Sequence, residues 1–67
     1  MADSFRAGLT DDVRKAIFAA LVEAQDRGVT PARSKQVVGD HFRIPYHLVS
    51  EVEAEGLEHE WPPLGDG

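Results

Sequence analysis

The first clear pattern along the chain is a set of apolar residues that recur every three or four positions between Thr10 and Gly28. Its members are Val13, Ala16, Ile17, Ala20, Leu21 and Ala24. This spacing places them on one face of an α-helix. Thr10 suits the N-cap, the two aspartates after it suit the positive end of the helix dipole, and Gly28 suits a left-handed C-cap. Phe18 and Val22 widen the apolar face, so we expect this helix to make contacts on two sides.

A shorter second helix is predicted from Thr30-Pro31 to about Phe42. Threonine can cap a helix, and proline at the first helical position loses no hydrogen bond, because that N–H has no partner within the helix. The expected inward residues of this helix are Val37, Val38 and Phe42.

Pro45 separates the second helix from a third. A residue before proline is pushed out of the α-helical region, so we predict a tight turn at Arg43 and Ile44. The third helix can open at Pro45, and its expected buried residues are Leu48, Val49 and Val52. Gly56 followed by Leu57 fits a Schellman ending, in which the glycine is left-handed and Leu57 folds back against Val52.

These elements predict an all-α fold, a small three-helix bundle in one domain over residues 9–61. Residues 1–8 are expected to form a flexible leader and residues 62–67 a flexible tail. The chain has no cysteine, which excludes disulfides and cysteine-ligated zinc. It also has no apolar run of the length that a signal peptide or a membrane span needs, so we expect a cytoplasmic protein.

A spaced apolar pattern runs across the predicted turn. A branched residue precedes a small one, and further apolar residues follow at fixed intervals: Val38, Gly39, Phe42, Ile44, Val49 and Val52. This pattern, over about residues 34–57, resembles the helix-turn-helix of sigma-factor-type transcriptional regulators. The resemblance implies that the last two helices cross closely at Gly39. The turn residue that is often glycine in this family is Arg43 here, and a non-glycine residue at positive φ is uncommon.

The same resemblance implies a set of DNA contacts. In the family, the exposed start of the last helix enters the major groove. The residues implied for base contacts are Tyr46, His47, Ser50 and Glu51. Those implied for phosphate contacts are Arg33, Lys35 and Arg43. Serine can donate or accept a hydrogen bond, and glutamate can accept one from cytosine N4, so the set is chemically workable.

The placement of charge argues against that use of the fold. The net charge is −5, and all seven Lys and Arg lie in residues 1–44, whereas residues 45–67 carry six acidic side chains and no basic one. Phosphate neutralisation by Lys and Arg supplies essentially all non-specific DNA affinity. An acidic last helix is therefore unsuited to a polyanion, although these glutamates could also be no more than a solvated helix face.

Our first hypothesis is a small accessory or regulatory module whose acidic last helix binds a basic protein surface or a larger assembly. Its expected contact residues are Tyr46, His47, Ser50, Glu51, Glu55 and Trp61. The alternative is a DNA-binding regulator that uses the same helix, as a homodimer in which the basic residues of two copies combine. A third is a purely structural role within a larger complex.

The sequence does not favour a metal site, a cofactor or catalysis. His47, Glu51, Glu55 and His59 recur every four residues, but such a strip drifts by roughly 40° per step on a helix, and the expected helix end at Gly56 separates off His59. No nucleophile–histidine–acid set or phosphate-binding glycine loop is present. A chain of 67 residues also leaves little room for a buried cleft beside its core, so we expect no enzyme activity.

Trp61 has two readings that the sequence leaves open. A tryptophan before two prolines can anchor an interface, because its side chain buries a large area. It can equally close the open end of a small helical core. Tyr46 has the same ambiguity between core edge and contact surface.

Overall fold

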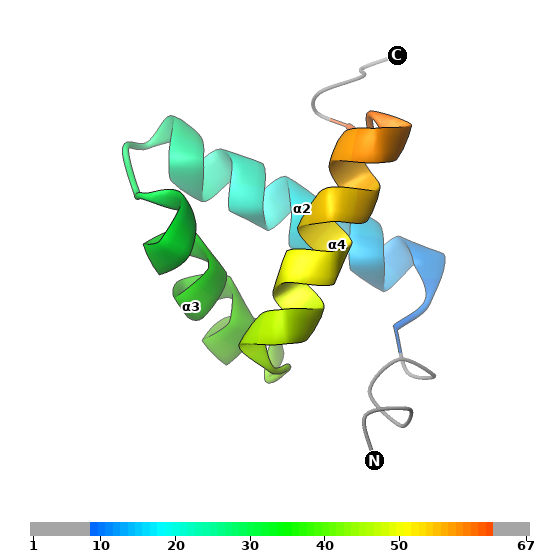
Figure 1. Ribbon diagram of the computed structural model, residues 1–67, viewed down its shortest axis with the longest axis horizontal. Helices are drawn as coiled ribbons and strands as arrows, with labels where there is room; N and C mark the ends of the chain where they lie inside the picture. The colour runs from blue at the N-terminus through cyan, green and yellow to red at the C-terminus, as the bar shows by residue number, and fades with distance from the viewer. Residues whose placement is uncertain (1–8, 63–67) are drawn as a thin grey trace.

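The computed structural model describes residues 9–62, which form three helices and no strand. They are α2 (Asp11–Asp26), α3 (Pro31–Phe42) and α4 (Tyr46–His59). Figure 1 shows α3 and α4 joined in a V, with α2 crossing behind α4. The expected all-α three-helix bundle is confirmed. The predicted leader, and the predicted tail after Pro62, lie outside the described residues.

Side-chain caps fix the starts of α2 and α3. The Thr10 hydroxyl accepts a hydrogen bond from the Val13 N–H at 3.3 Å, and the Thr30 hydroxyl accepts one from the Arg33 N–H at 3.2 Å. Gly28, just beyond the end of α2, has a φ of 97°, which only glycine adopts without strain. The predicted boundaries of these two helices are thus confirmed.

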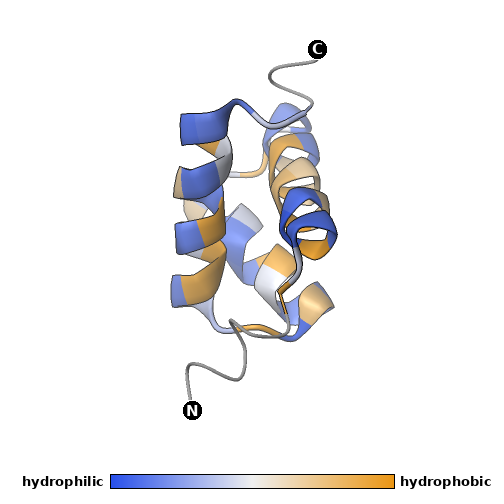
Figure 2. Ribbon diagram, turned by 90° about the vertical axis from the view of Figure 1, so that its right-hand side faces the viewer, coloured by the Kyte–Doolittle hydropathy of each residue, from blue (hydrophilic) through white to orange (hydrophobic). Residues whose placement is uncertain are grey.

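The core forms where the three helices face one another. Its buried apolar residues are Ile17, Phe18, Leu21, Val38, Leu48, Val49 and Val52. Figure 2 shows hydrophobic residues on the facing sides of the helices and hydrophilic residues outside. The predicted burial of Val38 and of the three apolar residues of α4 is confirmed, and Phe42 packs partly buried at the edge.

The prediction that Val37 points inward is wrong, because this side chain is 46% exposed. The inward side of α3 is formed by Ser34 and Val38, which lie four residues apart and so share a face, and Val37 lies one helical step to the side. Ser34 is completely buried. It can be buried because its hydroxyl donates to the Pro31 carbonyl at 2.7 Å and accepts from Gln25 Nε2 at 3.1 Å.

The predicted turn between α3 and α4 is confirmed. Arg43 ends α3 in the left-handed conformation, with φ 60° and ψ 46°. The two helices approach closely at Gly39, where an added Cβ would lie 3.1 Å from the Ile44 carbonyl oxygen and 3.3 Å from Val49 Cγ2. A side chain at position 39 would therefore fit only if the Ile44 carbonyl and the Val49 side chain moved by a few tenths of an ångström.

The predicted helix end at Gly56 is wrong. Helix α4 runs through this glycine to His59, and the left-handed residue that ends it is Glu60, at φ 52°. A Cβ on Gly56 would come closer than 3.0 Å to three carbons of the Phe18 ring. Gly56 therefore serves the packing of α2 on α4 and not a cap. Leu57 does not fold back on Val52, since it is 56% exposed.

Candidate functional site

The side of α4 opposite the core forms a continuous strip that is exposed at every member except Ser50, which is half-buried. Its residues, which we call the outer face of α4, are Tyr46, His47, Ser50, Glu51, Ala54, Leu57 and Glu58. They follow steps of three and four residues, which keeps them on one side of a helix. Two of them are large apolar side chains that lie open to solvent: Tyr46 is 46% exposed and Leu57 is 56% exposed. The outer face therefore combines carboxylates with apolar groups.

Glu53 lies on one flank of α4 and is bound within the bundle. One of its carboxylate oxygens lies 3.2 Å from Lys35 Nζ, and the other accepts a hydrogen bond from Gln25 Nε2 at 3.1 Å. The Lys35 and Glu53 side chains are only 20% and 21% exposed. The Lys35 ammonium also lies 5.7 Å from the centroid of the Tyr46 ring, within reach of a cation–π contact. The charge of Glu53 is therefore satisfied internally.

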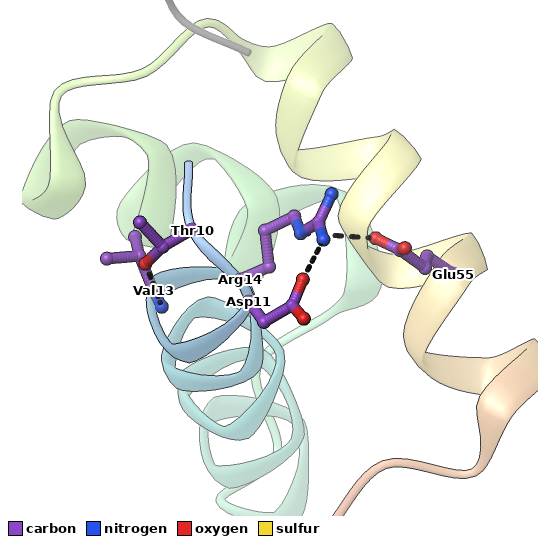
Figure 3. Close-up of polar contacts among 5 residues, drawn as sticks. All are labelled: Thr10, Asp11, Val13, Arg14 and Glu55. Carbon is purple, nitrogen blue, oxygen red and sulfur yellow. Dashed lines mark hydrogen bonds and ion pairs between the residues drawn. The ribbon is translucent and has the colours of Figure 1, made fainter. Parts of the chain in front are cut away.

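Glu55 lies on the opposite flank and faces Arg14 of α2. Its carboxylate oxygen is 3.6 Å from Arg14 Nε, and another nitrogen of the same guanidinium contacts Asp11 (Figure 3). Arg14 Nε is buried and makes no hydrogen bond within the described residues, so the Glu55 contact is a loose ion pair. The Glu55 side chain is one-third exposed. This predicted contact residue therefore lies at the edge of the outer face.

A hollow of about 210 Å³ opens between the start of α2 and the middle of α4. Its lining consists of Leu9, Arg14, Leu48, Glu51, Val52 and Glu55. Apolar groups, two carboxylates and the guanidinium of Arg14, which is already paired with Glu55, therefore meet at one opening.

The basic residues that the resemblance implied for phosphate contacts have different surroundings. Lys35 is bound to Glu53, as described above. Arg33 is exposed at the start of α3, where its guanidinium donates to Gln36 Oε1 at 3.3 Å. Arg43 is exposed at the turn. One of the three cations is thus already neutralised by a residue of the helix that would read the DNA.

Trp61 packs on the core at the end of α4. Its ring meets Phe18 edge-on, with 6.1 Å between ring centroids, and stacks on His59 at 6.2 Å. Lys15 Nζ lies 5.9 Å from the same ring. Trp61 is partly buried, and its backbone N–H donates a hydrogen bond to the Gly56 carbonyl at 3.0 Å. These contacts favour the reading of Trp61 as a cover over the core.

The histidines and glutamates along α4 are not gathered into one group. Because α4 continues past Gly56, His47 and His59 do lie on one helix. Even so, residues 9–62 contain no group of three or more His, Cys, Asp or Glu that could hold a metal ion. In the same part of the chain, no helix is both long and apolar enough to cross a membrane.

Three members of the outer face, Ala54, Leu57 and Glu58, were not among the contact residues predicted from the sequence. The assumed helix end at Gly56 removed the last two from the helix. Continuing the three- and four-residue steps from Ser50 past the glycine would have found all of them.

No family model, curated protein or solved structure matches this chain.

Proposed function

We propose that this protein is a small accessory or regulatory interaction module that binds a basic protein surface through the outer face of α4. The observation that carries the proposal is the exposure of Tyr46 and Leu57 on the same face as Glu51 and Glu58. No Lys or Arg follows Arg43 in the chain, so nothing basic from the last third of the sequence offsets that face.

The two kinds of side chain on this face have separate roles in binding. Tyr46 and Leu57 supply apolar area, and aromatic residues are enriched at the centres of protein interfaces. The carboxylates steer a basic partner toward the face and fix its register.

The proposal includes a helix-turn-helix-type arrangement of α3 and α4. Three features support it: the close approach at Gly39, the left-handed turn at Arg43, and the burial of Val49 and Val52 behind that turn. These are the positions that the family pattern assigns to the crossing, the turn and the anchoring of the second helix.

DNA binding through the same helix is the less favoured use of this arrangement. The exposed Arg33 and Arg43 would be available to phosphates, whereas Lys35 would first have to leave Glu53. The exposed carboxylates of Glu51 and Glu58 would face a polyanion. Repulsion between these carboxylates and the phosphates opposes the electrostatic attraction on which DNA binding depends.

A charge-reversal pair separates the two uses. The tagged wild type, a Glu51→Lys/Glu58→Lys variant and a matched control, Asp12→Lys/Asp26→Lys, are used for affinity capture from cells of the source organism. The control changes the net charge equally, at exposed positions of α2. We expect the wild type and the control to retain the same basic protein, released by high salt, and the α4 variant to lose it.

A gel shift with duplex DNA at low salt accompanies the capture. We expect no shift with the wild-type protein. Sequence-selective duplex binding, or equal loss of the captured protein in both charge-reversed variants, would overturn the proposal.

A further inference from the structure

A second apolar surface lies between α2 and α3, away from the outer face of α4. It is a groove of about 350 Å³, lined by no residue of α4. Its apolar lining includes Ala20, Ala24, Val37 and Phe42, and Glu23 and Arg27 lie on its rim. We call it the α2–α3 groove.

The groove exists because the apolar face of α2 is wider than the part that the core covers. Ile17, Phe18 and Leu21 are buried, while Ala20 and Ala24 on the adjoining side are only half-buried. On α3, Val37 is 46% exposed toward the same groove. Alanines keep the surface low, so the backbone of another helix can approach at the short end of the usual 8–10 Å interaxial range.

The charges on the rim favour a second copy of this chain as the occupant. The chain carries a net charge of −5, so two copies repel each other over most of their surfaces. The rim of the groove instead carries one glutamate and one arginine four residues apart on α2, which form an ion pair at 3.8 Å. In an antiparallel two-fold contact, Glu23 of each copy meets Arg27 of the other, and the rim is self-complementary.

We infer that the α2–α3 groove is the contact surface of a homodimer, in which α2 of one copy packs antiparallel across the groove of the other. This contact covers the exposed Val37 and adds apolar burial to a chain of 67 residues that has no disulfide. It leaves the outer face of α4 open in both copies, so the dimer does not depend on the proposed function.

Sedimentation equilibrium of the full chain over a wide concentration range tests this inference. The first variant is Val37→Asp, and its matched control is Leu57→Asp, at a comparably exposed residue of α4. We expect Val37→Asp to raise the dimer Kd by at least about tenfold, since it buries an unpaired carboxylate, and Leu57→Asp to leave the Kd unchanged. Circular dichroism checks that both variants are folded.

A charge swap provides the second arm. Arg27→Glu places like charges across the two-fold contact and should weaken the dimer, while the Glu23→Arg/Arg27→Glu double variant restores the pairing and should recover it. A wild type that stays monomeric at all concentrations overturns the inference. So does equal weakening by Val37→Asp and Leu57→Asp, or a double variant that fails to recover the dimer.

Discussion

The ring of Phe18 on α2 lies against the backbone of Gly56 on α4, in the space that any side chain at position 56 would occupy. Phe18 is 1% exposed and belongs to the central cluster, so its ring has no free side toward which to move. The close approach sets how α2 and α4 pack. It also explains why a glycine is present in the middle of a helix, where its intrinsic propensity is poor.

Replacing Gly56 with alanine should lower stability, against the helix propensities. Alanine is favoured over glycine in a helix by about 1 kcal/mol, but overpacking a core costs about 1–3 kcal/mol, and three ring carbons of Phe18 would be too close to the new methyl group. Urea denaturation followed by circular dichroism measures the difference. The control, Ala54→Gly at an exposed position of α4, should lose only the propensity term of about 1 kcal/mol. A Gly56→Ala variant more stable than the wild type by about 1 kcal/mol, the propensity term alone, would mean that the ring does not lie there.

Glu53 should contribute more to stability than the exposed glutamates of α4. Glu53→Ala removes the carboxylate that binds both Lys35 and Gln25, and leaves a largely covered ammonium without its partner. We expect a loss of about 1–2 kcal/mol, and a double-mutant cycle with Lys35→Ala should reveal coupling between the two residues. Glu58→Ala, at an exposed position, should stay within about 0.5 kcal/mol of the wild type. Equal effects at both glutamates would contradict the network.

Glycine at position 43 should stabilise the turn between α3 and α4. A non-glycine residue in the left-handed conformation costs roughly 1–2 kcal/mol. Glycine removes this strain, but it also loses more conformational entropy on folding, which offsets part of the gain. Since Arg43 has φ 60°, we expect Arg43→Gly to raise the free energy of unfolding by about 0.5–1 kcal/mol. Arg33→Gly, within the first turn of α3, should lower it by a similar amount. If both substitutions destabilise equally, the turn is not left-handed at Arg43.

Trp61 should act as a cover over the end of the core. Trp61→Ala removes the edge-on contact with Phe18, and we expect a loss of about 2 kcal/mol in thermal or urea unfolding. His59→Ala should cost well under about 1 kcal/mol, because His59 is exposed on the outer side of the indole. Trp61 is the only tryptophan of the chain, so in the wild type its emission should shift to the red during the same transition that circular dichroism reports. A shift that precedes unfolding would show that the ring is not part of the folded core.

Most of the helix boundaries could be predicted because their signals are local. Thr10 and Thr30 each cap the helix that follows them, and Pro45 prevents α3 from continuing into α4. The positions whose placement differs from the prediction are set by contacts with residues far away in the sequence. Gly56 has the local context of a helix end, and only the Phe18 ring, supplied by another helix, makes it an interior packing position.

Ser34 and Val37 show the same limit for burial. Valine is the better core residue by hydropathy, yet the serine is buried and the valine is half-exposed. The serine hydroxyl is satisfied by Pro31 and Gln25, a pairing that follows from how α2 and α3 meet and that the sequence of α3 alone does not reveal.

For the candidate site, the sequence indicated the acidic character of the last helix but not how its charges are divided. Glu53 and Glu55 face Lys35 and Arg14, whereas Glu58 lies on the exposed side. That division depends on which flank of α4 meets α2 and α3. It was therefore inaccessible until the three helices were placed together.

Site-specific photocross-linking is the most direct test of the central claim, that the outer face of α4 contacts a basic protein. A photoreactive phenylalanine analogue replaces Ala54, at the centre of that face, or Ala32, an exposed control position in the first turn of α3. Irradiation of cells that contain each variant should cross-link position 54, and not position 32, to a partner protein whose own isoelectric point is basic. Cross-linking of position 54 to nucleic acid, or equal protein adducts from both positions, would contradict the account.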